Sequence, residues 1–156
     1  MTTLTPLEQP AVKDDIQEIK KALANPIGTR TLKEISKGKK SAVIVVNDIT
    51  RPSPTYKLVL PLVEELNEAG IKNEKIFFMV ATGTHRDNTR RELEAILGKG
   101  ILEIFNVYNH HCQDEDDLVD LGATRDGVPV VINRKFWEAE VKILTGNIEP
   151  HQSAGF

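Results

Sequence analysis

The sequence predicts a single α/β domain with a Rossmann-like, largely parallel sheet and flanking helices. Apolar runs of strand length lie within residues 41–48, 75–81 and 101–109, and a further run starts at 141. Segments with helical periodicity separate the earlier runs, and this alternation favours right-handed crossovers between parallel strands. The chain has 156 residues, of which 40% are hydrophobic, so it is long enough for one domain with a sizeable core.

The first half of the chain predicts two helices around one strand. Residues 1–12 are an irregular lead-in, and 14–26 form a helix that Pro26 and Gly28 end. A buried strand at 41–48 runs into a loop whose prolines prevent further pairing. A helix then covers 55–70 with Gly70 as its stop, and Pro61 inside it predicts a kink or an early turn.

The second half begins with a strand at 75–81, which is apolar throughout from Ile76 and therefore buried on both faces. Its helix starts with a capping box formed by Thr89 and Glu92 and ends near Gly98. Residues 101–109 predict a third strand, and 118–136 predict a hairpin around the Asp-Gly pair at 126–127. The last strand, from 141, ends in a Thr-Gly turn.

Composition excludes several classes of function. The net charge is −3 and the basic residues are dispersed, which argues against a nucleic-acid surface. No apolar run approaches the ~20 residues of a membrane span, and the N-terminus lacks the apolar core of a secretory signal. The single cysteine, Cys112, forms no disulfide framework, so we expect a cytoplasmic protein without membrane or nucleic-acid partners.

Unusual polar residues follow the predicted strands, at the edge where parallel sheets bind ligands. The guanidinium of Arg51 suits a carboxylate or phosphate, and Asp48 is placed to hold it; the alternative is an ordinary surface ion pair. His85 and His151 suit proton transfer near neutral pH, although each could also be an isolated surface histidine. The candidates after the strands are Asp48, Thr50, Arg51, Thr82, Gly83, Thr84, His85, Asn147, Glu149 and His151.

Two further kinds of site are disfavoured. His110, His111 and Cys112 are potential metal ligands, but neighbouring histidines on extended backbone diverge and no second ligand cluster follows, so we predict no metal site. The Thr-Gly turns can cradle an anion through backbone N–H groups. Neither a GxGxxG nor a GxxxxGK[ST] motif is present, which argues against the usual dinucleotide or P-loop site.

The motifs "DITRP", "ATGTHR", "NH" before an acidic loop and "TGNIEPHQSAGF" together resemble the N-terminal domain of the lactate racemase family, in family order from about residue 25. The resemblance implies a nickel-pincer nucleotide cofactor and inversion of C2 of a 2-hydroxy acid by hydride transfer. It implies that His85 and His151 are the acid/base pair and that Arg51, with Asp48, binds the substrate carboxylate. It places Thr50, Thr82, Gly83 and Thr84 near the cofactor.

The family pattern continues beyond this sequence into a "SGGRK" segment, whose lysine holds the cofactor, and later supplies a nickel-binding histidine. We therefore expect residues 1–156 to be one domain of a two-domain protein. Its active site would lie in the cleft against a C-terminal domain, and the isolated chain would be inactive. The alternative is a non-catalytic α/β module that binds an anion or a nucleotide.

Overall fold

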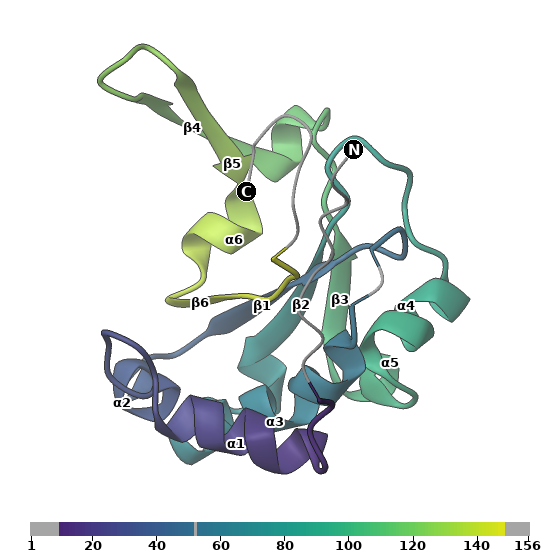
Figure 1. The fold of residues 1–156 in the computed structure, drawn as a ribbon. Helices are drawn as coiled ribbons and strands as arrows, with labels where there is room; N and C mark the ends of the chain where they lie inside the picture. The colour runs from purple at the N-terminus through teal and green to yellow at the C-terminus, as the bar shows by residue number, and fades with distance from the viewer. Residues whose placement is uncertain (1–9, 52, 149–156) are drawn as a thin grey trace, which may run out of the picture.

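The computed structural model describes residues 10–51 and 53–148, and this part of the chain contains a four-stranded parallel sheet (Figure 1). Its strands are β1 (Ala42–Asn47), β2 (Ile76–Ala81), β3 (Asn106–Asn109) and β6 (Val141–Leu144). Their order across the sheet is β3-β2-β1-β6, and all neighbouring pairs are parallel. The α/β class predicted from the sequence is confirmed.

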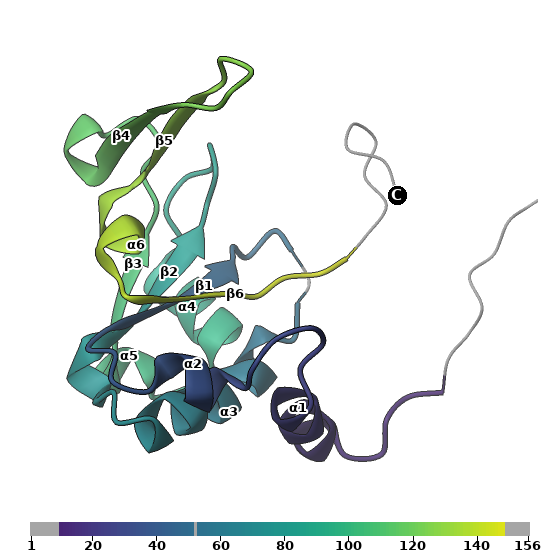
Figure 2. The same cartoon turned by 90° about the vertical axis from the view of Figure 1, so that its left-hand side faces the viewer.

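Helices cover the two faces of the sheet unequally. Five helices lie on one face, whereas α6 and a projecting hairpin lie on the other (Figures 1 and 2). The first group is α1 (Asp15–Ala24), α2 (Leu32–Ser36), α3 (Thr55–Glu68), α4 (Arg90–Leu97) and α5 (Ile101–Ile104). The second comprises β4 (Leu118–Ala123), β5 (Pro129–Asn133) and α6 (Arg134–Glu138), and short 3₁₀ turns occupy Asn73–Lys75 and Glu115–Asp117.

The core follows from the alternation of side chains along the two central strands. Ala42, Ile44 and Val46 of β1 are buried in the cluster that contains the helices, together with Phe78 of β2. On the opposite face, Val43 is buried in a smaller cluster with Met79 and Ala139. Both central strands are thus apolar on both faces, as predicted for parallel strands that helices cover.

The helix signals in the sequence were largely correct. The Thr89–Glu92 capping box opens α4, with the Thr89 N–H donating to Glu92 Oε2 at 2.8 Å and the Glu92 N–H donating to Thr89 Oγ1 at 3.4 Å. The predicted helix at 14–26 is α1, capped by Asp14. Helix α3 continues past Pro61 to Glu68, so the early turn that the proline suggested does not occur.

The predicted strand at 101–109 was wrong in its first half. Residues Ile101–Ile104 form helix α5, and only Asn106–Asn109 pair with β2. Gly100, with φ of 84°, starts the turn, and Ile101 and Phe105 are both buried, at a spacing of four residues that either a helix or a strand places on one face. Phe105 also packs edge-on against Phe78. An apolar run this short does not itself distinguish helix from strand.

The predicted hairpin is confirmed as far as Asn133: β4 and β5 pair in antiparallel fashion, and Gly127 has φ of 80° in the turn between them. Its last predicted residues, 134–136, instead begin helix α6. Helices α2 and α6 were not predicted, because segments of five residues carry too little periodicity. None of the helices in the described ranges is long and apolar enough to span a membrane.

The strand order creates a topological switch point between β1 and β6. From β1 the chain proceeds through α3, β2 and the helices α4 and α5 to β3, all on one side of β1. It then crosses the opposite face through α6 and adds β6 on the other side of β1. Loops at the carboxyl ends of such strands diverge and leave a crevice, which is where open α/β sheets bind ligands.

Candidate functional site at the carboxyl edge of the sheet

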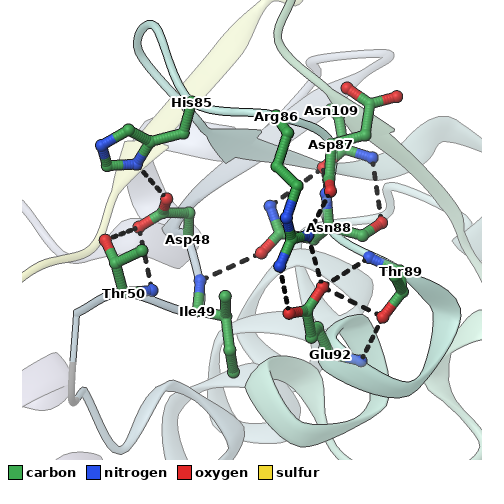
Figure 3. A network of polar contacts seen from close by, with 10 residues as sticks. All are labelled: Asp48, Ile49, Thr50, His85, Arg86, Asp87, Asn88, Thr89, Glu92 and Asn109. Atoms are coloured by element: carbon green, nitrogen blue, oxygen red, sulfur yellow. Dashed lines mark hydrogen bonds and ion pairs between the residues drawn. The ribbon is translucent and has the colours of Figure 1, made fainter.

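A carboxylate–histidine pair lies at this edge (Figure 3). Asp48 follows β1 and His85 follows β2, and His85 Nδ1 lies 2.6 Å from Asp48 Oδ2. The Asp48 side chain is 5% exposed, whereas that of His85 is 48% exposed. The parallel pairing of β1 with β2 brings the two loops together across 37 residues of sequence. The pair therefore consists of a buried carboxylate that supports an accessible imidazole.

The second oxygen of Asp48 is also occupied. Asp48 Oδ1 accepts hydrogen bonds from the Thr50 hydroxyl at 2.7 Å and from the Thr50 N–H at 3.2 Å. Burial alone would raise the pKa of Asp48, but the hydrogen bonds from His85 and Thr50 outweigh it and lower that pKa. An ionised carboxylate only accepts hydrogen bonds, so His85 donates from Nδ1. In the neutral ring, Nε2 then carries the lone pair and can accept a proton.

The turn after β2 presents His85 beside a small cavity. The His85 N–H donates to the Thr82 carbonyl at 3.0 Å, and Gly83 has φ of 60°, a conformation that favours glycine. Gly83 and Thr84 are exposed, whereas Thr82 is buried and its hydroxyl donates to the His110 carbonyl. A cavity of about 180 Å³ is lined by Gly83, Thr84, His85, His110, His111, Cys112 and Gln113.

Arg51 does not have the support that its sequence neighbourhood suggested. Its side chain is exposed, and its Nη1 lies 3.5 Å from the Thr50 hydroxyl. Asp48 pairs with His85 instead, and within residues 10–51 and 53–148 no ion pair joins Asp48 to Arg51. The sequence suggested Arg51 as the partner of Asp48 because the two lie three residues apart. The observed partner, His85, comes from the loop after the neighbouring strand, and such a contact is not visible in the local sequence. His151 and Glu149 lie outside the described residues.

The two adjacent histidines point to different partners, as predicted. His110 Nδ1 lies 3.3 Å from Asn133 Nδ2, and burial together with the nearby His111 lowers the pKa of His110. His111 bridges Asp117 at 3.1 Å and Asp87 at 2.9 Å. Hydrogen bonding to Asp117 raises the pKa of His111 against the effect of burial, and Asp87 adds to the rise.

Potential metal ligands do gather in this loop. Ligand atoms of His111, Asp114 and Asp117 lie within 4.8 Å of one another, although the sequence predicted no metal site. Within this group, His111 Nδ1 is hydrogen-bonded to Asp117, and Asp114 Oδ1 accepts the N–H of Asp116 as the cap of the 3₁₀ turn.

Sequence reasoning missed two asparagines at the same edge, Asn88 and Asn109. Asn88 is 6% exposed, and its side chain contacts both the loop after β1 and the end of β3 (Figure 3). The signal available in the sequence was an amide residue directly before the helix cap Thr89 and another at the end of a strand. Neither position suggests a contact with the other until the strand order is known.

A parallel sheet with helices on both faces and a carboxylate–histidine pair at its carboxyl edge places the domain in the doubly wound α/β class, whose members bind ligands at that edge. The family model of the lactate racemase N-terminal domain matches residues 1–156. The chain therefore belongs to the lactate racemase N-terminal domain family.

Individual relatives agree with the family assignment. The chain is 35% identical over 138 residues to lactate racemase of Thermoanaerobacterium thermosaccharolyticum, covering 88% of this chain and 32% of that protein. It is 34% identical over 140 residues to lactate racemase of Lactiplantibacillus plantarum, covering 90% of this chain and 33% of that protein. The structure of the lactate racemase apoprotein from T. thermosaccharolyticum superposes with a TM-score of 0.82 at 32% identity, covering 88% of this chain and 33% of that one. The chain thus spans about a third of the length of the relatives it matches.

Proposed function

We propose that the protein containing this chain is a lactate racemase-like isomerase that inverts C2 of a 2-hydroxy acid, with His85 as one of its acid/base groups. The observation that carries the proposal is the Asp48–His85 pair, which holds an accessible imidazole at the ligand-binding edge of the sheet. The proposal is supported by membership of the chain in a family whose named relatives are lactate racemases.

His85 supplies the proton transfer. Its Nε2 accepts the proton of the substrate hydroxyl while the C2 hydrogen departs with its electron pair, which leaves a 2-keto acid. Return of that hydrogen to the opposite face, with the proton restored to oxygen, gives the other enantiomer. Asp48 stabilises the imidazolium that forms in the first step, because it is a buried anion in contact with Nδ1. His151 is proposed from the family resemblance to serve the enantiomer that binds with its hydroxyl on the other side.

Direct deprotonation of C2 is the less favourable route, because a neighbouring carboxylate acidifies that C–H bond only weakly. No protein side chain accepts a hydride, so the route requires a cofactor. When bound, the nickel-pincer nucleotide proposed from the resemblance would supply the hydride acceptor.

The turn at Gly83 and Thr84 leaves open space beside His85 in which part of such a cofactor could lie. A Cβ added at Gly83 would meet nothing within 4 Å, and Gly83 and Thr84 are exposed beside His85. Thr82 is buried and the Thr50 hydroxyl donates to Asp48, so Gly83 and Thr84 are the residues of this turn that are most accessible to the cofactor.

Arg51 is proposed as the anchor of the substrate carboxylate. Its guanidinium is exposed in the loop that carries Asp48 and can form a bidentate pair with a carboxylate. This anchor would fix the orientation of the 2-hydroxy acid, so that its hydroxyl and C2 hydrogen face their respective acceptors.

A second domain of the same protein would complete the site. An apolar groove of about 260 Å³ lies on the sheet face opposite α1–α5, lined by residues that include Val45, Met79, Phe136 and Leu144. Leu144 is 72% exposed, which supports packing of further protein against this face.

Racemisation of lactate in heavy water by the full-length holoenzyme tests the proposal. The hydride route retains the C2 hydrogen, so the product should contain little deuterium at C2 at low conversion. His85→Ala should lower the rate roughly 10²–10⁴-fold, the range for a lost general acid or base. Substantial deuterium at C2 would overturn the hydride route, and a rate near that of the wild type in His85→Ala would remove His85 from the mechanism.

A further inference from the structure

The polar network in Figure 3 extends beyond the Asp48–His85 pair and reaches a buried amide whose contacts join three loops of the site. We infer that Asn88 is a positioning residue, which sets the geometry of the pair by tying the loop that carries Asp48 to the loop that carries His85. The inference rests on the proposed function, since it concerns the alignment of the proposed acid/base group.

The contacts of Asn88 close a ring between the two loops. Asn88 lies three residues after His85, and its Oδ1 accepts the N–H of Ile49 at 3.0 Å. Ile49 is the residue directly after Asp48. The ring is completed by the 2.6 Å contact between His85 Nδ1 and Asp48 Oδ2. Each loop is therefore held to the other at two points, one of which is the catalytic contact itself.

The third strand fixes the amide of Asn88 in this orientation. Asn109, at the end of β3, accepts on its Oδ1 both the Asn88 Nδ2–H at 3.1 Å and the Asn88 N–H at 3.0 Å. Because Asn109 Oδ1 requires donors, Asn88 must present its nitrogen to Asn109 and its oxygen to Ile49. The orientation of the amide is thus determined by the network.

The other side of the same loop is anchored to helix α4. Arg86 forms a bidentate ion pair with Glu92, with nitrogen–oxygen distances of 2.9 and 2.8 Å. Hydrogen bonding from Arg86 and from the Thr89 backbone lowers the pKa of Glu92 to about 2, so this carboxylate is ionised at neutral pH. Helix α4 therefore fixes the loop that carries His85. The hydrogen bond from Ile49 to Asn88 then ties the loop that carries Asp48 to this fixed loop.

Because Asn88 is buried, water cannot easily replace its hydrogen bond to Ile49. Asn88 is 6% exposed, and replacement by alanine would leave the Ile49 N–H without its side-chain acceptor. The loop after β1 would then be free to shift, and displacements of about 1 Å at a reacting centre can cost 10²-fold in rate. The expected effect falls on kcat, because the side chain of Asn88 bonds to Ile49 and Asn109, and neither residue is among those proposed to contact the substrate (Figure 3).

The test is a double-mutant cycle in the full-length holoenzyme with lactate as substrate. Asn88→Ala should lower kcat roughly 10–10²-fold and change KM less than about threefold. In the Asp48→Asn background, where the carboxylate is lost and His85 is held in the wrong tautomer, the alignment of the two residues no longer supports proton transfer, so the same change should cost less than about threefold. A purely structural role would lower the melting temperature in both backgrounds and give equal losses of kcat in both.

Controls separate this inference from the proposed function. Asn67→Ala removes an exposed side-chain amide contact, 3.0 Å to Asn73, near the end of helix α3, and should leave kcat within about twofold. His85→Ala in the same series tests the proposed function. A wild-type kcat in His85→Ala would overturn the proposed function. A low kcat in His85→Ala together with a wild-type kcat in Asn88→Ala would overturn only the positioning role of Asn88. Asn88→Asp keeps the acceptor for the Ile49 N–H and loses only the donor to Asn109, so it should lower kcat less than Asn88→Ala does. If Asn88→Ala does not fold, Asn88→Ser, whose side chain is one atom shorter and withdraws the acceptor from Ile49, carries the same expectation. Equal losses in both backgrounds would also overturn the inference.

Discussion

Asp48→Asn is the substitution whose outcome follows most directly from the contacts of the site. Asp48 Oδ1 accepts two hydrogen bonds from Thr50, and Oδ2 contacts His85 Nδ1. An asparagine at this position must keep its oxygen toward Thr50, since its NH₂ group would face the Thr50 N–H as donor against donor. The NH₂ group is therefore directed at His85.

That orientation inverts the tautomer of His85. Nδ1 must now accept the amide hydrogen, so in the neutral ring Nε2 carries a proton and cannot accept one from the substrate. A hydrogen bond to a charged group is worth about 1.5–3 kcal/mol. At about 1.4 kcal/mol per factor of ten, its loss alone corresponds to roughly 10–200-fold in rate. Together with the wrong tautomer, we expect kcat to fall by at least about 10²-fold, within the range of a lost general base.

Racemisation of lactate by the full-length holoenzyme, with circular dichroism to confirm folding, measures this effect. Asp120→Asn is a matched control, because Asp120 Oδ1 likewise accepts an N–H two residues later, from Gly122 at 2.7 Å, but lies in strand β4. The control should keep kcat within about twofold of the wild type. A folded Asp48→Asn enzyme that loses less than about threefold in kcat would refute the tautomer argument.

Two further predictions concern the neighbouring charged groups. Arg51→Ala should raise KM for lactate about 10–10²-fold and Arg51→Lys by less, since lysine keeps the charge but loses the fork; unchanged KM in both would return Arg51 to the ordinary surface. Contacts with Asp117 and Asp87 raise the pKa of His111 in the folded protein. The contribution of His111 to the free energy of unfolding is therefore complete below the pKa of about 6.5 that it has in the unfolded chain, and is lost as the pH rises through its pKa in the folded chain. His111→Gln should therefore lower the melting temperature more at pH 5 than at pH 9, and equal decreases at both would contradict the linkage.

Local chemistry made much of the fold predictable. The run from Ile76 to Ala81 is apolar at every position and is followed by a Thr-Gly turn, which is typical of a short strand covered on both faces, and β2 has those bounds. The capping box of Thr89 and Glu92 satisfies backbone donors within one turn, so it marks the start of α4 whatever the surroundings. The segment 101–109 failed, because its apolar residues fit both periodicities and the packing of Phe105 on Phe78 decided between them.

For the candidate site, the location of the residues could be predicted from the sequence, but the contacts between them could not. That Asp48 and His85 lie at one sheet edge followed from the order of strands and loops, because parallel strands end on the same side. The contact between them did not follow: the sequence suggested Arg51 as the partner of Asp48, three residues away, and the partner is 37 residues away.

The sequence by itself determined the α/β class, the family and the residues that carry the proposed chemistry, because these depend on periodicity, caps and short motifs within one stretch of chain. Only the tertiary structure decided which side chains meet. It joined Asp48 to His85, placed Asn88 between Ile49 and Asn109, and turned the Thr82 hydroxyl toward His110. The physical reason is that hydrogen bonds between loops depend on strand order and register, and the packing of all the elements together sets these.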